Sequence, residues 1–290
     1  MPFRPRRSAL YMPGSNLRAL EKAKSLVADT LILDLEDAVA PDAKTLARQQ
    51  IVASIQGGGY GNRELVVRVN GLDTEWGMDD IRAVATSGAD AICLPKVEAA
   101  AEVEELVRLL DDAGAPENMK IWVMSETPKG VLNINEVAAS HARLAVIVMG
   151  TSDLAKDLRV PHTPSRLGFL TSLGLCLLAA RANNIDILDG VYLDLDDDMG
   201  YRASCLQGRE LGFDGKTLIH PKQLSVANEV FGPSDDELVR CKKIIAAWAE
   251  AEGEGRGVVL VDGKLVENLH IEEAHRLLTI SEAIDKMQVG

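Results

Sequence analysis

Two carboxylic acids, Glu126 and Asp153, are the strongest candidates in this 290-residue chain for binding a metal ion. Each comes shortly after an apolar run. Carboxylate oxygens with no neighbouring His or Cys favour a hard cation such as Mg²⁺, with Mn²⁺ as the second option. Two such ligands leave room for water and for a substrate oxygen that the ion would polarise. Asp153 also fits the N-cap of a helix, because Leu154–Leu158 reads as a helical turn.

A second acidic group and an arginine lie at the ends of two earlier apolar runs. Asp34, Glu36 and Asp37 lie together, and Arg68 lies further along the chain. The three acids would orient water molecules bound to the metal ion. A planar guanidinium such as that of Arg68 suits a bidentate carboxylate or the enolate oxygen of a substrate. A structural pairing of Arg68 with Glu36 or Asp37 explains the same residues equally well.

The N-terminal region concentrates positive charge in an otherwise acidic chain. The cations are Arg7, Arg18, Lys22 and Lys24. They would attract phosphate groups if they lie at the mouth of the site. Lys22 and Lys24 are also well explained as solvated residues of a helix. We expect His220, far downstream, to orient a loop rather than to transfer protons.

The elements that must position these residues are short apolar runs that alternate with longer amphipathic segments. The predicted strands are Ala9–Met12, Thr30–Asp34, Leu65–Val69, Ala91–Leu94, Ile121–Met124, Leu144–Met149, Asp186–Asp189 and Gly215–Ile219. Strands separated by helices imply parallel βαβ units. Eight such units fit a (β/α)₈ TIM barrel, an α/β fold whose chemistry occurs at the carboxyl ends of the strands. An open doubly wound sheet would require a glycine-rich phosphate loop, and Pro13–Asn16 does not have that pattern.

The chain is predicted to divide into a barrel over residues 1–232, which contains the active site, and a small C-terminal cap over residues 233–290. The cap is predicted to contain a helix over Asp235–Ala251, a glycine-rich hinge over residues 252–257, a hairpin with strands Val258–Val261 and Lys264–Val266, and a last helix over Ile271–Ile284. Asp262 and Gly263 between these strands are typical of a tight hairpin turn.

Composition and charge restrict the classes of function. Apolar residues make up 47% of the chain, enough for one large core, and 44 acidic against 31 basic residues give a net charge of −13. Such an acidic chain would repel nucleic acid. No apolar stretch approaches the roughly 20 residues that cross a bilayer, so no membrane partner is expected. The four cysteines lack zinc or redox spacing, and no apolar signal segment follows the first arginines, so we expect a cytoplasmic protein.

Several motifs occur in an order that resembles one known family. They are Arg7–Ser15, Leu33–Pro41, Val67–Asn70, Ser125–Thr127, Gly150–Leu154 and Ile219–Pro221. Together they resemble the citrate lyase β-subunit-like family, which includes malyl-CoA, methylmalyl-CoA and citramalyl-CoA lyases. The resemblance covers nearly the whole chain. It implies a (β/α)₈ barrel of the phosphoenolpyruvate/pyruvate type that assembles as a homotrimer or hexamer.

The resemblance also implies roles for individual residues. Mg²⁺ would be held by Glu126 and Asp153, and Arg68 would bind the substrate, a CoA thioester. The acidic cluster near that metal comprises Asp34, Glu36 and Asp37. The phosphate groups attracted by the N-terminal cations would then be those of CoA, bound by Arg7, Arg18 and Lys22.

One segment departs from the family pattern. Family lyases often carry a Met-Ile/Val-Asp triplet in the cap, and the resemblance implies that its Asp enters the neighbouring subunit's site and exchanges a proton with acetyl-CoA. The matching segment here is Leu265–Glu267. Glutamate adds a methylene, and a displacement of about 1 Å can cost about 100-fold in rate. Either Glu267 is the acid/base, with Arg68 and Asp34 as the other expected catalytic residues, or the activity has drifted from that of the family lyases.

These features predict a Mg²⁺-dependent β-hydroxyacyl-CoA lyase. Reversible Claisen-type cleavage of malyl-CoA, methylmalyl-CoA or citramalyl-CoA would release an α-oxo acid and an acyl-CoA. One alternative is a malyl-CoA thioesterase, which hydrolyses the thioester in the same site. Another is a citrate lyase β-subunit that acts on an acyl-carrier-protein thioester. The identity of the α-oxo acid depends on pocket contacts worth only about 1–3 kcal/mol per methylene.

Overall fold

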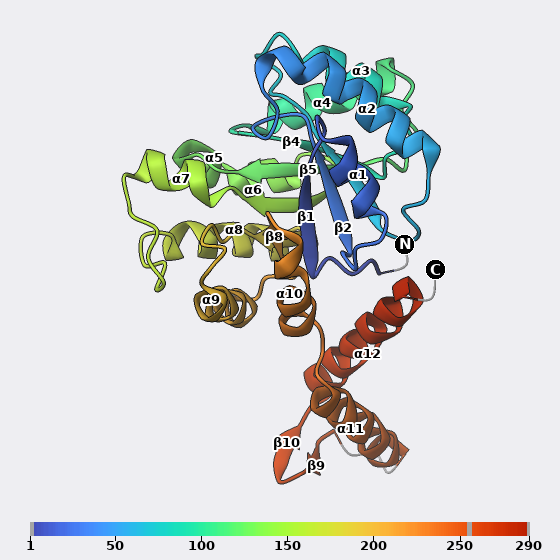
Figure 1. The fold of residues 1–290 in the computed structure, drawn as a ribbon. Helices are drawn as coiled ribbons and strands as arrows, with labels where there is room; N and C mark the ends of the chain where they lie inside the picture. Colours follow the sequence, from blue (N-terminus) through green and yellow to red (C-terminus); the bar gives the residue numbers. More distant parts are fainter. Residues whose placement is uncertain (1–2, 254–256, 289–290) are drawn as a thin grey trace. The chain divides into compact units, whose positions relative to one another are not determined.

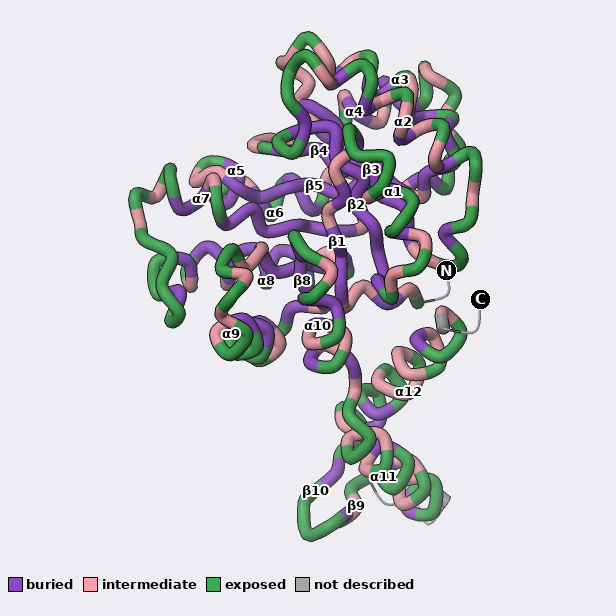
Figure 2. The backbone as a smooth tube through the Cα atoms, in the orientation of Figure 1, coloured by how far each residue is buried: buried purple, intermediate pink, exposed green. Residues whose placement is uncertain are grey.

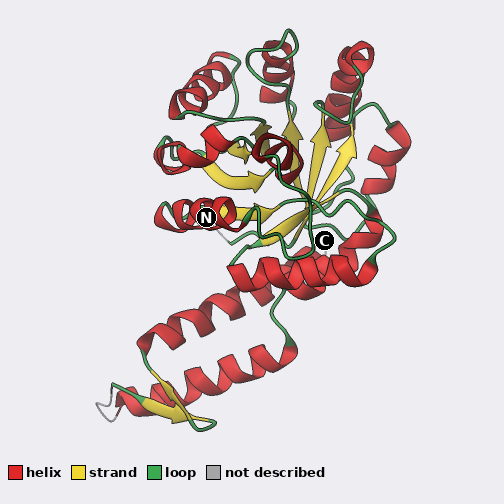
Figure 3. Cartoon of the chain, turned by 90° about the vertical axis from the view of Figure 1, so that its left-hand side faces the viewer, coloured by secondary structure: helices red, strands yellow, loops and turns green. Residues whose placement is uncertain are grey.

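Eight parallel strands form the closed barrel predicted from the sequence (Figures 1 and 3). The computed structural model describes residues 3–253 and 257–288. Each strand pairs with the next along the chain, and β8 returns to pair with β1. The strands are β1 (Ser8–Pro13), β2 (Thr30–Asp34), β3 (Glu64–Arg68), β4 (Ala91–Leu94), β5 (Lys120–Ser125), β6 (Leu144–Met149), β7 (Asp186–Asp189) and β8 (Gly215–Leu218). Each predicted bound lies within about one residue of the observed one.

Helices follow the strands and surround the barrel (Figure 3). They are α1 (Leu17–Ala23), α2 (Lys44–Gly57), α3 (Gly77–Ala85), α4 (Ala100–Asp112), α5 (Pro128–Leu132), α6 (Ile134–Ala139), α7 (Thr151–Leu158), α8 (Leu170–Ala182), α9 (Asp198–Leu211) and α10 (Leu224–Phe231), with short 3₁₀ segments at Pro41–Ala43 and Pro221–Gln223. Polar residues begin several of them: Asn16 caps α1 and Asp197 caps α9. Because these caps follow the carboxyl ends of strands, polar groups gather at that end of the barrel.

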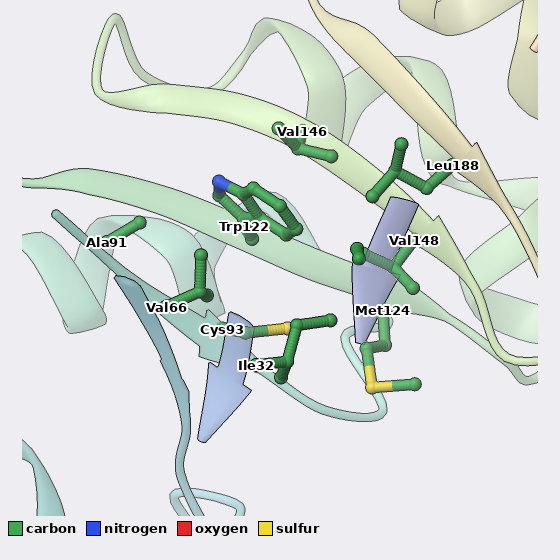
Figure 4. Close-up of a cluster of buried hydrophobic side chains, with 10 residues drawn as sticks. Ile32, Val66, Ala91, Cys93, Trp122, Met124, Val146, Val148 and Leu188 are labelled. Carbon is green, nitrogen blue, oxygen red and sulfur yellow. The ribbon is translucent and has the colours of Figure 1, made fainter. Parts of the chain in front are cut away.

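Apolar side chains fill the inside of the barrel (Figure 4). The buried cluster comprises Ala9, Ile32, Val66, Ala91, Cys93, Trp122, Met124, Val146, Val148 and Leu188. Trp122 is the largest of the fully buried side chains. The residues between them along each strand are also buried, so the strands appear purple in Figure 2. Burial on both faces explains why the sequence shows nearly continuous apolar runs rather than alternation.

Buried ion pairs close the amino end of the barrel. Arg6, which precedes β1, donates to Glu64 at 2.7 and 2.8 Å and to Asp186 at 2.5 Å. These two acids are the first residues of β3 and β7. The Arg6 guanidinium also lies 5.5 Å from the ring centroid of Trp122. The charges at this end neutralise one another within the fold.

The chain from Glu229 onward belongs to a second compact unit, and residues 6–228 form the first. The elements of the second unit are α11 (Asp235–Gly253), β9 (Val259–Val261), β10 (Lys264–Val266) and α12 (Asn268–Gln288). The antiparallel pairing of β9 and β10 confirms the predicted hairpin. Asp262 and Gly263 have φ values of 49° and 75°, as a type I′ turn requires. A separate buried core comprises Cys241, Ile244, Val261, Val266, Ile271 and Ala274.

The boundary between the units lies four residues earlier than the sequence predicted, between Asn228 and Glu229. Helix α10 continues across it, so the sequence shows no break there. In the predicted hinge, Glu252 and Gly253 belong to α11, and residues 254–256 lie outside the described residues. Among the helices of residues 3–253 and 257–288, none combines the length and apolar character needed to span a membrane.

Candidate active site

Arg68 and Asp34 form a buried bidentate ion pair at the carboxyl ends of two adjacent strands. The parallel register of β2 and β3 places Asp34 opposite Arg68. Arg68 Nε donates to Asp34 Oδ1 at 2.7 Å, and Nη2 donates to Oδ2 at 2.6 Å. Asp34 has no solvent exposure, and it also accepts the backbone N–H groups of Glu36 and Ala38. These contacts occupy both carboxylate oxygens, so Asp34 orients the guanidinium, and its predicted catalytic role stays a prediction.

The same guanidinium faces two further carboxylates. Arg68 Nη1 lies 2.9 Å from Glu36 Oε2 and 3.9 Å from Asp37 Oδ2. The structural pairing of Arg68 with Glu36 and Asp37 is therefore present, with Glu36 the closer partner. Arg68 also lies 4.7 Å from the ring centroid of Tyr11, a cation–π contact. The guanidinium is fixed from several sides and remains charged.

Glu126 lies just beyond the end of β5 and is 3% exposed. Its Oε1 accepts the backbone N–H of Lys96 at 2.8 Å. Gly150, just beyond β6, leaves room for this carboxylate, because a Cβ at position 150 would overlap Glu126 Oε2. Burial, and secondarily the charge of Glu36, raises the pKa of Glu126 to about 7. A nearby cation would favour its ionised form, which burial otherwise makes costly.

Asp153 lies in the first turn of α7, where the helix dipole favours an acid. The N-cap of this helix is Gly150, so the alternative that Asp153 is the N-cap is wrong. Lys96 Nζ lies 3.5 Å from Asp153 Oδ2 and also forms an ion pair with Glu36 Oε1. One ammonium therefore bridges Asp153 and Glu36, while the backbone of the same lysine binds Glu126.

The acids at this end of the barrel fit a divalent cation. Glu36 Oε2 is buried without a hydrogen bond, because the nearby Arg68 nitrogen lies outside hydrogen-bonding geometry. The space that Gly150 leaves beside Glu126 is one that any side-chain carbon would fill. Only oxygen donors are present, which suits a hard cation. Within the described residues no three Asp, Glu, His or Cys side chains form a ready-made ligand set, so an ion here would also need water or substrate oxygens.

Two lysines of this cluster were given no role by the sequence patterns. Lys96 follows β4 and has a φ of 52°, a left-handed conformation that is uncommon for a residue with a Cβ. Lys44 is buried, and its Nζ donates to the backbone oxygens of Leu35 and Glu36 at 2.8 and 2.7 Å. Lys44 therefore holds the loop that carries the acids. The position of Lys96 after the predicted strand Ala91–Leu94 places it, like Arg68, at the carboxyl end of the barrel, but nothing near Lys44 in the sequence indicates its role.

A cavity of about 630 Å³ opens beside the cluster. Its wall includes Glu36, Asp37, Trp76, Lys96, Glu98 and Thr127. This volume is typical of sites for small molecules. The cavity therefore adjoins the acids that fit a cation, and a ligand in it would contact the Lys96 side chain.

The predicted phosphate-binding cations divide between the two ends of the barrel. Arg18 and Lys22 lie on α1, which follows the carboxyl end of β1, and both are exposed. The structure contradicts the predicted place of Arg7 at the mouth. Arg7 precedes β1 at the amino end, and its Nε and Nη2 donate to Asp29 at 2.8 Å each. The Arg7 guanidinium neutralises the carboxylate of Asp29, which is buried and would be costly without a partner.

Two other predicted residues lie in loops. His220 Nδ1 accepts the backbone N–H of Lys222 at 3.1 Å and caps a 3₁₀ segment, which confirms its role in orienting a loop. Glu267 is exposed and follows β10 in the second unit, where its backbone N–H donates to His270 Nδ1 at 3.0 Å. Its catalytic role stays a prediction.

A closed barrel of eight parallel strands, with buried acids and cations at their carboxyl ends, defines an enzyme of the (β/α)₈ class. The chain belongs to the HpcH/HpaI aldolase/citrate lyase family, whose model matches residues 7–221. The resemblance found in the sequence is therefore confirmed. As a family member, the chain is an enzyme whose relatives act on CoA-related substrates.

Two kinds of protein are among those similar to this chain in sequence. The chain is 53% identical to a (3S)-malyl-CoA thioesterase from Cereibacter sphaeroides, over 97% of this chain and 96% of that protein. It is 35% identical to the citrate lyase subunit beta of Leuconostoc mesenteroides, over 97% and 94% of the two chains.

Solved structures agree with the fold. The CitE protein of Mycobacterium tuberculosis, in complex with magnesium, acetoacetate and coenzyme A, is 26% identical and matches with a TM-score of 0.76. The match covers 97% of this chain and 100% of that chain. RipC from Yersinia pestis is 29% identical, with a TM-score of 0.69 over 82% of this chain and all of that one. Magnesium and CoA binding thus occur in a relative that shares the whole fold.

Proposed function

We propose that this chain hydrolyses the thioester of a β-hydroxyacyl-CoA such as (3S)-malyl-CoA in a Mg²⁺-dependent reaction. The observation that carries the proposal is the 53% identity, across nearly the whole chain, with a (3S)-malyl-CoA thioesterase. Cleavage of the carbon–carbon bond, the reaction favoured by the sequence motifs, is the second candidate. It is supported by relatives named as citrate lyase β-subunits at 34–35% identity.

Glu126 and Asp153 would hold the metal ion. The raised pKa of Glu126 and the Lys96 ammonium that pairs with Asp153 both support a cation at this place. Mg²⁺, when bound, would supply a Lewis acid that polarises a substrate oxygen. Glu36 and Asp37 lie close enough to Arg68 to belong to the same cluster and would order water there.

Arg68 would bind negative charge on the substrate. Its guanidinium is held by Asp34 before any substrate arrives, so little reorganisation is needed when charge develops on the thioester oxygen. Water adds to the thioester carbonyl carbon, the carbon–sulfur bond breaks, and the water proton passes to the leaving thiolate. The products are a carboxylic acid and free CoA. Glu267 is our candidate for moving this proton.

In the second candidate reaction, the proton of the substrate hydroxyl passes to water, and the carbon–carbon bond breaks to release an α-oxo acid and leave an acyl-CoA enolate. Glu267 would then protonate the remaining acyl-CoA enolate. Arg18 and Lys22, exposed on α1, would bind the CoA phosphates in either reaction. We further propose a homotrimer or hexamer in which the cap of one chain reaches the site of the next. The exposed position of Glu267 in a unit with its own core supports that arrangement.

A product assay tests the proposal. The purified chain is incubated with malyl-CoA and with citramalyl-CoA, with and without Mg²⁺, and both free thiol and α-oxo acid are measured. Malate plus free CoA from malyl-CoA, dependent on Mg²⁺, is the expected result. Formation of glyoxylate and acetyl-CoA would instead identify the chain as a lyase. Turnover only of an acyl-carrier-protein thioester would instead identify a citrate lyase β-subunit.

A further inference from the structure

Lys96 places a positive charge among the acids that fit a metal ion. We propose that its ammonium is an internal counter-ion which a divalent cation displaces into the adjoining cavity. The inference rests on the proposed metal site at Glu126 and Asp153. It assigns Lys96 a role in metal binding that the sequence patterns did not indicate.

The contacts of Lys96 divide between its backbone and its side chain. The backbone N–H donates to Glu126 Oε1 at 2.8 Å, and the φ of 52° directs it there. The ammonium pairs with Glu36 Oε1 and lies 3.5 Å from Asp153 Oδ2. One residue therefore touches three acids from different strands or loops. A metal ion bound to Asp153 would be attracted by the same group of carboxylates.

The ammonium and a divalent cation cannot both keep these contacts. Asp34 is matched by Arg68 in a bidentate pair, which leaves Lys96 as a near partner of Glu36 and Asp153. Two cations within about 4 Å of each other repel one another strongly in a site that water only partly reaches. The divalent ion has the stronger attraction for oxygen donors, so the lysine is the one that moves.

The side chain of Lys96 has somewhere to go. It is 47% exposed, whereas the Glu36 side chain is 10% exposed, so the lysine can move without disturbing buried packing. It also lines the cavity of about 630 Å³. The bond from its backbone to Glu126 does not depend on the position of the ammonium. Displacement would thus bring a free cation into the cavity, where it would attract a carboxylate or phosphate of a bound ligand.

Calorimetric titration with MgCl₂ at pH 8.5 tests the displacement directly. Lys96→Met keeps the Cβ and most of the length of the unbranched chain but removes the charge. We expect this variant to bind Mg²⁺ about tenfold more tightly than the wild type, because a competing cation is gone. Lys96→Arg should stay near the wild-type affinity. Lys129→Met is the matched control, because Lys129 pairs with Glu98 on the cavity wall and should leave the affinity unchanged.

Thermal unfolding with EDTA and with saturating Mg²⁺ provides the second measurement. Lys96→Met should lower the Tm of the metal-free protein by a few degrees and leave that of the Mg²⁺ form unchanged. Equal losses in both forms, or an unchanged or weaker Mg²⁺ affinity, would overturn the role of Lys96 while the metal site stands. Failure of the wild type to bind Mg²⁺ would overturn the metal site and this inference together.

Discussion

The Glu126 carboxylate is almost inaccessible to solvent, and Asp153 supplies a second carboxylate from the first turn of α7. Replacing either by its amide, Glu126→Gln or Asp153→Asn, keeps the shape and removes the charge. We expect Mg²⁺-dependent turnover of malyl-CoA to fall at least about 100-fold, the scale of losing one preorganised electrostatic contact. Steady-state kinetics over a range of Mg²⁺ concentrations measures the loss.

Far-ultraviolet circular dichroism should show an unchanged barrel in both variants. Asp157→Asn, in the last turns of the same helix, provides a control outside the cluster. Full activity in Glu126→Gln or Asp153→Asn would remove the metal assignment.

The pKa of Glu126 also predicts how the stability of the metal-free protein depends on pH. Burial, together with Glu36, raises it to about 7 in the folded state. A raised pKa favours folding below the unfolded value, and this contribution is lost as the pH rises through about 7. From pH 5 to pH 8 the wild type should therefore lose up to about 3 kcal/mol, at 1.36 kcal/mol per pKa unit. Glu126→Gln should not show this loss.

Urea unfolding in EDTA at a series of pH values measures both profiles. Added Mg²⁺ should reduce the loss in the wild type, because the ion replaces the missing counter-charge. Parallel profiles for the wild type and the variant would contradict the raised pKa.

At the scale of strands and helices, Gly150 leaves the space that a carboxylate from a neighbouring strand occupies. It lies between β6 and α7, and a Cβ there would overlap the Glu126 carboxylate that follows β5. We expect Gly150→Ala to weaken Mg²⁺ binding at least about tenfold and to cost about 1–3 kcal/mol of unfolding free energy. Calorimetry and urea unfolding measure the two effects.

Gly174→Ala is the matched control. Gly174 lies within α8, and a Cβ there would have nothing within 4 Å. This change should raise the stability by about 0.5–1 kcal/mol, because alanine loses less backbone freedom in a helix. Similar effects from the two substitutions would show that the contact with Glu126 does not matter.

The strands were predictable from the sequence because burial on both faces leaves runs that are almost wholly apolar. The same reasoning identified the strand ends, and thus Arg68, Glu126 and Asp153, as residues of one end of the barrel. It could not predict which acid pairs with Arg68. That depends on the register of β2 and β3, which places Asp34 opposite the arginine and makes Glu36 a secondary partner.

Three other features depend on geometry that spacing does not reveal. The φ of Lys96 turns its N–H toward Glu126 and could not be read from the residue type. Arg7 lies one residue before β1 and so belongs to the opposite end, although it is close in sequence to Arg18. A cationic residue near the N-terminus of the chain therefore need not lie at the carboxyl end of the barrel.

For the whole molecule, the role of the cap is a prediction about assembly. If Glu267 acts on the site of a neighbouring chain, each site needs the barrel of one chain and the cap of another. Glu126→Gln and Glu267→Gln should each be inactive alone. Subunits mixed at random should then recover up to about a quarter of wild-type activity, because half of the barrels and half of the caps are intact.

Co-expression of the two variants in equal amounts, without selection for mixed assemblies, gives the random mixture for the assay. The double variant mixed with Glu267→Gln should recover nothing. Absence of activity in the mixed assembly, or full activity of Glu267→Gln alone, would contradict a cap that acts on a neighbour.

The ion pair between Asp34 and Arg68 joins two residues that face each other across neighbouring strands. If β2 slid along β3 during folding, the arginine would be left inside the protein without its partner, at a cost of about 3–5 kcal/mol. Misaligned barrels are therefore penalised by the same two side chains that we propose to prepare the protein for its substrate. The rate of turnover would therefore also report whether the barrel has closed in the correct register. A redesigned version of this barrel could be screened for correct folding with an activity assay.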